Sequence, residues 1–395
     1  RNTTGVTDHI WLLQGGSGRG SLWLDVFKTD WAGFDVAALF GNRVAFLITD
    51  RRGTGLSVPP LSCPHPEHFA ECAKYIQSLW GGDDALAQFT VSAASRDLDY
   101  LMQTISVPQV GGRIHLYGLS AGTFWAQRFI ALHTVHLETI TLDGIVSLPF
   151  SFLDWDQHID SVGRYLLALC GSDPWCSSLW NGQDPLVATR TLFDSLSSPS
   201  SCISHIPGAT VPYDGFLQYL FSTLLSGRRE RMLIPAIIFR LIRCNSADIK
   251  ALTRLFSFPI QPSQGSAIAG IPDLPIQYNQ MTSELIQLDL ATLPDFAGAI
   301  KAEKSMFFSG HNAVNAWQPM WNDWPHYPHD KFWGVTPEFG HTPTLLLQGT
   351  LDPFTPTALG SWLFHELSVI QGHNDTVHLA VMPTSSHATL QDSAV

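Results

Sequence analysis

The sequence predicts an α/β protein whose mostly parallel sheet is covered by helices on both faces and interrupted by a long helical insertion. At both ends of the chain, short apolar runs rich in β-branched and aromatic residues alternate with amphipathic stretches of helical length. This alternation is typical of a parallel sheet that is buried on both faces. Between about Leu148 and Gly334 the alternation stops, which indicates an insertion carried on the sheet.

The sheet elements are expected in both flanking parts of the chain. The predicted strands are His9 to Leu13, Arg43 to Thr49, Arg113 to Tyr117, Glu138 to Val146, Thr344 to Leu347 and Val377 to Met382. Predicted helices lie between them at Ser92 to Ile105, Ala121 to His133 and Thr357 to Ile370. We therefore expect residues 1–148 and 336–395 to form one core domain.

The middle segment, residues 149–335, is expected to form a mostly helical cap. Helical patterns occur at Trp155 to Ala168, Tyr213 to Leu225 and Arg231 to Arg243, and no further strand–helix alternation follows. A length of 395 residues suits a core with one inserted module. The composition is 45% hydrophobic and 14% charged, which is enough apolar residues to bury a large interior.

Composition also excludes several kinds of partner. The formal charge of −12 and the absence of long Lys/Arg runs argue against nucleic acid. No stretch approaches the ~18 apolar residues that a membrane span needs, and no leader precedes Arg1, so we expect a processed, soluble chain. No cysteine or histidine spacing matches a metal site, so neither a metal nor a cofactor is expected. The sequence makes no prediction about oligomeric state.

Six cysteines and two glycosylation sequons indicate an oxidising, secretory compartment. The sequons begin at Asn2 and Asn374. Two cysteine pairs are close in sequence, Cys63 with Cys72 and Cys170 with Cys176, which leaves Cys202 and Cys244 to pair across the cap. We expect the protein to be extracellular or to reside in the secretory lumen.

The strongest chemical signal is the segment Gly118 to Gly122, which reads Gly-Leu-Ser-Ala-Gly between a predicted strand and a predicted helix. A serine in such a turn adopts a strained backbone that projects its hydroxyl above the sheet edge, and small neighbours let strand and helix approach. An ordinary glycine-rich turn is the alternative. The position between strand and helix favours Ser120 as a nucleophile of an α/β-hydrolase fold.

A serine hydroxyl needs a base, and the base needs a carboxylate to orient it. In this fold the order along the chain is serine, acid, histidine. Asp352 follows the strand ending at Leu347, and His387 follows the strand ending at Met382, so both match in order and placement.

Other residues compete for these roles. His373 and His378 are the nearest alternative bases, but one lies before the last strand and the other within it. Asp143 also ends a predicted strand and is an alternative acid, although we expect it to bind loop backbone amides. The sequence favours Asp352 and His387.

Acyl transfer also requires donors for the oxyanion of the tetrahedral intermediate. The backbone amide of Ala121, directly after the serine, is the first candidate. Gly16 is the second, because the glycine-rich loop Gln14 to Gly18 follows the first strand. A phosphate-binding loop is the alternative, but the Lys-Ser/Thr and the GxGxxG spacing that such loops carry are absent.

These residues resemble the prolyl-aminopeptidase family of serine peptidases, and within it the branch of secreted tripeptidyl aminopeptidases. The Gln14 to Gly18 loop is similar to the family's His-Gly-Gly-Pro-Gly, with Gln14 and Ser17 in place of His and Pro. Thr49 to Ser57 resembles its Asp-x-Arg-Gly-x-Gly-x-Ser segment, and Ala93 to Leu101 resembles the helix before the nucleophile strand. Trp155 to Gln157, with Cys170 to Cys176, resembles the start of the branch's cap and its disulfide loop. No motif matches over Ser201 to Phe332.

The resemblance implies an α/β-hydrolase fold and a peptidase whose cap carboxylates hold a free peptide amine. Candidate carboxylates are Asp154, Asp156, Asp160, Asp214 and Glu230. The expected cap also contains a group of aromatic residues, which either line an apolar substrate pocket or pack the cap onto the core. For most of these residues we favour the packing role. The members are Trp317, Trp321, Trp324, Tyr327, Phe332 and Trp333.

Three classes of function follow, and the leading one is cleavage of peptide bonds near a free N-terminus through an acyl-enzyme. The second is a carboxylesterase or lactonase that acts on an apolar small-molecule ester with the same triad. The third, a non-catalytic binding protein, is disfavoured because all three triad positions are filled. An epoxide hydrolase or dehalogenase is disfavoured because those enzymes carry aspartate at the position of Ser120.

Overall fold

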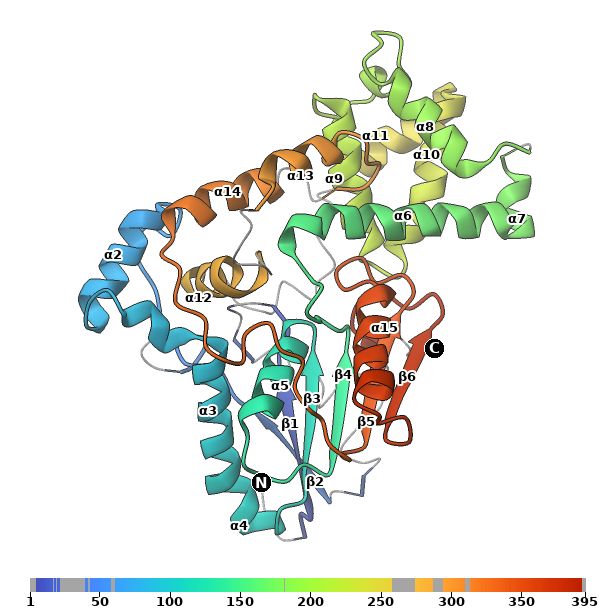
Figure 1. Ribbon diagram of the computed structural model, residues 1–395. Helices are drawn as coiled ribbons and strands as arrows, with labels where there is room; N and C mark the ends of the chain where they lie inside the picture. Colours follow the sequence, from blue (N-terminus) through green and yellow to red (C-terminus); the bar gives the residue numbers. More distant parts are fainter. Residues whose placement is uncertain are drawn as a thin grey trace.

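Six parallel strands form one sheet in the order β2-β1-β3-β4-β5-β6 (Figure 1). The computed structural model describes residues 5–16, 18, 20–21, 40–41, 43–57, 61–180, 182–257, 274–286, 294–309 and 313–392. The strands are β1 (Asp8–Leu13), β2 (Val44–Ile48), β3 (Ile114–Leu119), β4 (Thr139–Asp143), β5 (Thr344–Gly349) and β6 (Val377–Met382). All six predicted strands are confirmed.

Alternating side chains of the strands serve two separate cores, as the period of two in a strand requires. Trp11 and Leu13 point into the large core formed with α3 (Val91–Leu101), α5 (Ala121–Leu132) and α15 (Thr357–His365). Leu12 points to the opposite face, where Tyr117 and Ala388 join it. Both faces of β1 are therefore buried, which explains its continuous apolar sequence.

The structure describes the following longer helices: α2 (Phe69–Trp80), α3 (Val91–Leu101), α4 (Val107–Val110), α5 (Ala121–Leu132), α6 (Trp155–Ser172), α7 (Pro174–Ser178), α8 (Pro185–Ser195), α9 (Tyr213–Leu225), α10 (Leu233–Arg243), α11 (Ser246–Phe256), α12 (Leu274–Gln280), α13 (Phe296–Glu303), α14 (Ala313–Asp323), α15 (Thr357–His365) and α16 (Thr389–Asp392). Short 3-10 or π-helical turns are η2 (Ala85–Phe89), η3 (Met102–Ser106), η4 (Phe152–Asp154), η5 (Cys202–His205), η6 (Glu230–Met232), η8 (Met281–Leu285) and η9 (Glu366–Ile370).

The prediction for β4 was too long by three residues at its carboxyl end. The strand ends at Asp143 because Gly144 has a φ of 63°, which an extended strand does not permit. The carbonyl of Asp143 instead accepts a hydrogen bond from the Ser120 amide at 2.9 Å. This contact joins the ends of β3 and β4.

The described elements between β4 and β5 are all helical and form two groups (Figure 1). Helices α6, α8, α9, α10 and α11 share a hydrophobic core of their own. Helices α12 and α14 instead pack on α2 and η2, which precede β3 in sequence. The segment of residues 61–89 thus contributes to the layer above the sheet, which the sequence did not indicate.

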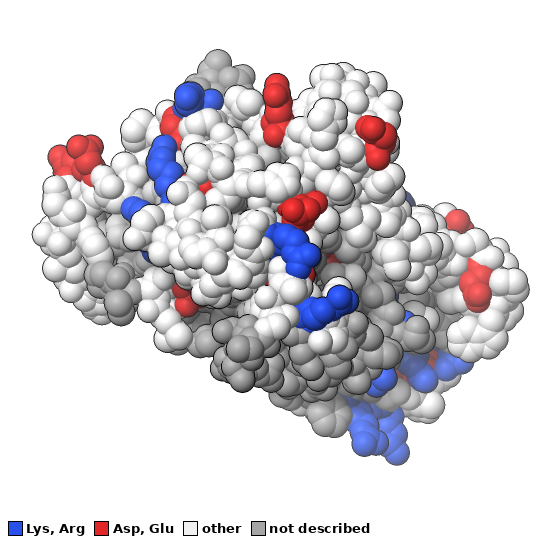
Figure 2. Space-filling view, turned by 90° about the horizontal axis from the view of Figure 1, so that it is seen from below, with Lys and Arg blue, Asp and Glu red and all other residues white. Residues whose placement is uncertain are grey.

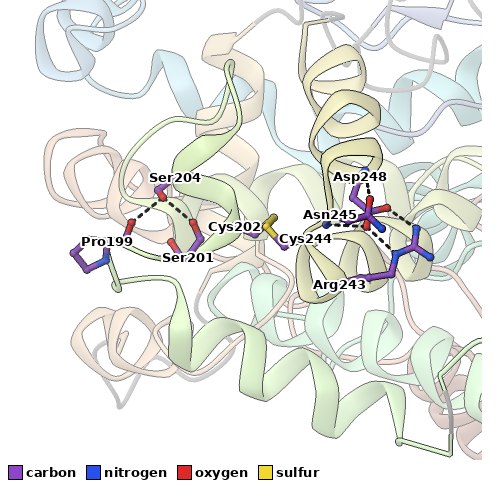
Figure 3. The surroundings of a disulfide bond; sticks show 8 residues. All are labelled: Pro199, Ser201, Cys202, Ser204, Arg243, Cys244, Asn245 and Asp248. Carbon is purple, nitrogen blue, oxygen red and sulfur yellow. Dashed lines mark hydrogen bonds and ion pairs between the residues drawn. A yellow bond between two sulfur atoms is a disulfide. The ribbon is translucent and has the colours of Figure 1, made fainter.

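Three disulfides join the cysteines as predicted: Cys63–Cys72, Cys170–Cys176 and Cys202–Cys244. Figure 3 shows the third, in which Cys202 of η5 meets Cys244 at the end of α10. Directly after it, the Asn245 side chain accepts a bond from the Asp248 amide at 2.9 Å, and Arg243 donates to the Asp248 carboxylate at 2.6 and 2.8 Å. The disulfide thus connects η5 to a capped turn between α10 and α11.

Replacing both Cys202 and Cys244 with serine is expected to lower the free energy of unfolding by about 4 kcal/mol, because their bond closes the longest of the three loops, with a separation of 42 residues. The same change at Cys170 and Cys176, separated by 6 residues, is expected to cost only about 2 kcal/mol. Urea unfolding of the two double variants measures the difference. Equal losses would show that local packing, rather than loop length, determines these contributions.

Basic and acidic side chains both occur on the face in Figure 2, most of which is uncharged. Among the described residues, no helix combines the length and hydrophobicity that a membrane crossing requires.

Candidate active site

Ser120 lies in a sharp turn between β3 and α5, with φ 53° and ψ −125°. A left-handed φ is strained for serine, so the surrounding structure must enforce it. The close approach of strand and helix does so: a Cβ on Gly118 would lie 2.8 Å from the carbonyl oxygen of Gly122, and one on Gly122 would overlap the backbone of Leu13. The two glycines therefore serve the close packing that the sequence predicted.

The loop after β1 lies directly against Ser120. A Cβ on Gly15 would lie 2.8 Å from the Cβ of Ser120, so only glycine fits at this position. Gly16 follows with a φ of 74°, and Ala121 is the first residue of α5. Amides in the first turn of a helix have no partner within the helix and carry its positive dipole end. The sequence identified Gly16 but missed Gly15, whose contact with the serine is visible only in three dimensions.

The far end of this loop is held by Asp50, which follows β2. The Asp50 carboxylate accepts hydrogen bonds from the Ser21 amide and, at 2.7 Å, from the Leu56 amide. Two residues on, Arg52 donates to both carboxylate oxygens of Asp97 on α3, at 2.5 and 2.6 Å. The segment therefore links the glycine-rich loop and β2 to α3.

His387 and Asp352 form a hydrogen-bonded pair at the carboxyl ends of β6 and β5. The His387 Nδ1 lies 2.8 Å from the Asp352 Oδ2. Asp352 is fully buried, and its Oδ1 accepts the amides of Phe354 and Thr355, both at 2.9 Å. These hydrogen bonds hold the Asp352 carboxylate in a fixed orientation toward His387.

Thr355 contacts both members of this pair and was missed by the sequence analysis. Its hydroxyl donates to the Asp352 Oδ2 at 2.7 Å and lies 3.3 Å from the His387 Nδ1. A threonine three residues after an aspartate commonly binds that side chain, so the spacing carried a weak signal for this contact.

The His387 ring lies close to the end of β4 and hence to the serine turn. A Cβ on Gly144 would lie 3.0 Å from the His387 Cε1, and the residue before it, Asp143, binds the Ser120 amide through its carbonyl. No hydrogen bond joins the Ser120 hydroxyl to the imidazole within the described part of the chain. Such bonds are often long before substrate binds.

The charges around His387 favour its protonated form. Burial lowers the pKa of the imidazole, but the charge and hydrogen bond of Asp352 and the charge of Asp143 raise it, and the net effect is a raised pKa.

The competing residues occupy other positions. The Asp143 side chain accepts bonds from the Thr389 amide at 2.9 Å, the Leu390 amide at 3.2 Å and the Tyr117 hydroxyl at 3.0 Å, so it anchors α16 by binding backbone amides as expected. His378 is exposed within β6. The His373 ring lies 5.8 Å from that of His341.

Aromatic rings from the segment between β4 and β5 reach His387 through Phe354. This ring packs edge-on against His387, with centroids 5.3 Å apart, and stacks on Trp155 of α6, also at 5.3 Å. Trp317 contacts Phe152 at 5.1 Å and Trp155 at 6.4 Å. We call the rings of Phe354, Trp155, Phe152 and Trp317 the aromatic cluster. Trp317 is its member from the predicted aromatic group. Trp321 and Trp324 pack into the core shared with α2, which is the packing role we favoured for them.

The five candidate carboxylates of the cap divide by position. Asp154 and Asp156 flank Trp155 at the start of α6 and so lie near the aromatic cluster. The carboxylate of Asp160 accepts the Phe307 and Phe308 amides and pairs with Arg164. Asp214 and Glu230 are exposed.

His158 adds a polar group to the same turn of α6. Burial lowers its pKa, opposed by the charges of Asp154 and Asp352. Its Nδ1 is buried and has no hydrogen-bond partner among the described residues. The start of α6 therefore presents carboxylates and a neutral imidazole near Asp352.

Together, the strand order, the strained serine turn after β3, and the acid and histidine after β5 and β6 define the α/β-hydrolase fold.

Comparison with solved structures finds similarities at low sequence identity. The chain is similar to the esterase EaEST from Exiguobacterium antarcticum, at 11% identity and a TM-score of 0.40, over 98% of this chain and 88% of that one. It is similar to VinJ at 14% identity and a TM-score of 0.42, over 98% and 86% of the two chains. It also resembles Est816, described as an N-acyl homoserine lactone degrading enzyme, at 15% identity and a TM-score of 0.37, over 99% and 90%. At TM-scores below 0.5 we draw no conclusion about this chain from these similarities.

No protein-family model matches the sequence, and no curated protein matches it.

Proposed function

We propose that the protein is a serine hydrolase that cleaves peptide bonds near a free N-terminus through an acyl-enzyme, with Ser120, His387 and Asp352 as its triad. The observation that carries the proposal is the hydrogen bond between partly buried His387 and fully buried Asp352, beside the strained turn of Ser120. In this mechanism His387 takes the proton of Ser120 as its Oγ attacks the carbonyl carbon, and returns it to the leaving group. Water then attacks the acyl-enzyme with the same base.

The amides of Gly16 and Ala121 are proposed to hold the oxyanion. Gly15 packs against the Ser120 Cβ, which brings the glycine-rich loop to the nucleophile, and Ala121 begins α5. Each donor of this kind is worth about 3 kcal/mol in the barrier.

Recognition of the peptide amine is assigned to Asp154 and Asp156. They flank Trp155, and through Phe354 this tryptophan is connected to His387. The resemblance to the tripeptidyl aminopeptidase branch gives cap carboxylates this role. We also propose the cap boundaries 149–335, with residues 61–89 as part of the same layer.

The second candidate is a carboxylesterase or lactonase acting on an apolar ester. The rings of Trp155, Phe354, Phe152 and Trp317 favour it, because together they offer an aromatic wall beside the base.

Acetylation of the substrate amine is expected to lower kcat/KM by roughly tenfold to more than a hundredfold, because it removes a charge-assisted hydrogen bond worth about 1.5–3 kcal/mol. Rates on free and N-acetylated forms of one aminoacyl arylamide measure this effect. Asp154→Asn should reduce the discrimination, whereas Asp214→Asn, at an exposed cap position, should preserve it. Equal rates on the two substrates, with faster turnover of short-acyl aryl esters, would favour the esterase.

The rate is expected to rise with pH through a pKa above the ordinary 6.5 of histidine, because only neutral His387 accepts the serine proton and its pKa is raised. A kcat/KM profile between about pH 5 and pH 9 measures this limb. A limb well below 6.5 would show that the electrostatic effect of the buried carboxylates on His387 is absent in the working enzyme.

We propose that the protein is secreted. Two features support this: the three disulfides, and the sequon at Asn374, which is exposed in the turn before β6. The sequon at Asn2 lies outside the described residues. The proposed partner is a peptide or small ester substrate.

A further inference from the structure

A polar cavity of about 170 Å³ is lined by residues of α3, of α5 and of the segment 327–333 that leads from α14 toward β5. Its charged and aromatic lining includes Arg96, Arg128, Glu284, Asp330, His329 and Trp333. Arg128 comes seven residues after Ala121, about 10 Å further along α5, and no proposed catalytic residue lines the cavity. The cavity is therefore separate from the Ser120 site.

A buried ion pair between Arg128 and Glu284 forms the floor of this cavity, and both side chains also form hydrogen bonds with neighbouring protein groups. Arg128 is 6% exposed and donates to the Ser92 hydroxyl and to the Glu284 Oε2, both at 2.8 Å. The Tyr327 hydroxyl donates to the other Glu284 oxygen at 2.6 Å. These groups neutralise one another.

Two further charged side chains line the cavity. Arg96 forms no ion pair within the described part of the chain. The Asp330 side chain is 34% exposed, and its Oδ1 forms a long ion pair with the Arg128 Nη1 at 3.7 Å and accepts the Phe332 amide at 3.0 Å. Within the described residues its Oδ2 accepts no hydrogen bond, so this oxygen can bind a ligand. One guanidinium and one carboxylate thus face the cavity, while the four charged groups sum to zero. This balance favours a ligand that carries both charges over a simple anion or cation.

Size and shape restrict the ligand further. At ~30 Å³ per water molecule the cavity holds about six waters. Its volume is smaller than the roughly 300–1,000 Å³ of drug-sized pockets. The His329 and Trp333 rings stack with centroids 3.8 Å apart and an angle of 5°, so part of the wall is flat and aromatic. A ligand of six to eight heavy atoms with a small apolar group fits these dimensions.

We propose that this cavity binds a small zwitterion of the α-amino-acid type, with its carboxylate on Arg96, its ammonium on Asp330 and its side chain beside Trp333. The site is additional to the proposed hydrolase site, and its occupation does not depend on turnover.

Isothermal titration of the Ser120→Ala chain with glycine, L-alanine and L-proline tests the proposal. Saturable binding of at least one amino acid is expected. N-acetyl-L-alanine and L-alanine methyl ester, which each lack one charge, should bind at least tenfold more weakly than L-alanine. Arg96→Gln and Asp330→Asn should each weaken binding at least tenfold, because each removes one charged partner. Arg254→Gln, at an exposed arginine without an ion pair among the described residues, should leave it unchanged.

Two results would overturn the proposal. The first is no saturable binding of any of the three amino acids to folded protein. The second is binding that persists at full strength in both Arg96→Gln and Asp330→Asn, which would place the ligand elsewhere, including the Ser120 site. Because the readout is binding, it stays informative if the proposed peptidase activity is wrong.

Discussion

Ser120→Ala is expected to lower kcat/KM by about 10⁶-fold, the order of loss found when a serine nucleophile is removed. No nearby hydroxyl can replace it: the Thr123 hydroxyl, one turn on, donates to the Ser120 carbonyl at 2.6 Å. The change deletes one oxygen and should alter the free energy of unfolding by less than about 0.5 kcal/mol. Steady-state kinetics and thermal unfolding of the same preparation measure both quantities.

Ser386→Ala is the matched control, because Ser386 directly precedes His387 and its hydroxyl donates to the Ser226 carbonyl at 3.1 Å. It should keep activity within about tenfold of the parent chain. If activity survives in Ser120→Ala but is lost in Ser386→Ala, the nucleophile is not Ser120 and lies in the turn before His387.

Asp352→Asn is expected to lower kcat by about 10⁴-fold while the fold persists. An asparagine oxygen can still accept the Phe354 and Thr355 amides, which now bind Asp352 at 2.9 Å. Its amide group cannot accept the Nδ1 proton of His387, so the imidazole takes the wrong tautomer and its positive charge loses a partner. Kinetics at saturating substrate measure the loss in kcat.

Asp143→Asn distinguishes the two buried carboxylates near His387. Asp143 binds the Thr389 and Leu390 amides, so its neutralisation should cost roughly 1–3 kcal/mol of stability and a far smaller share of activity. The opposite pattern, with activity lost in Asp143→Asn and kept in Asp352→Asn, would make Asp143 the triad acid.

The sheet could be predicted from the sequence because its signals are local. An apolar run that ends in a glycine or a turn marks a buried parallel strand, and β1, β3, β5 and β6 begin within about a residue of the positions expected. Ser120 is recognisable for the same reason, since the glycines that its turn requires are two residues away on either side. The disulfides followed from short spacing and the even number of cysteines.

What the sequence did not reveal depends on contacts between distant segments. Packing of α12 and α14 on α2 joins residues more than 180 positions apart, and no local pattern encodes it. The Arg128–Glu284 ion pair spans 156 positions. The sequence does not show that Phe354 lies between His387 and Trp155, because these neighbours come from the loop after β6 and from α6.

The central claim, that Ser120 is the nucleophile of a serine hydrolase, is tested most directly by labelling the active protein with a serine-directed phosphonate and mapping the adduct by mass spectrometry. Trypsin releases Ser120 in the peptide of residues 114–128, in which it is the single serine. We predict a stoichiometric adduct on Ser120 that is absent from Ser120→Ala. An adduct on another residue, or hydrolysis by a protein that never takes up the label, would contradict the account.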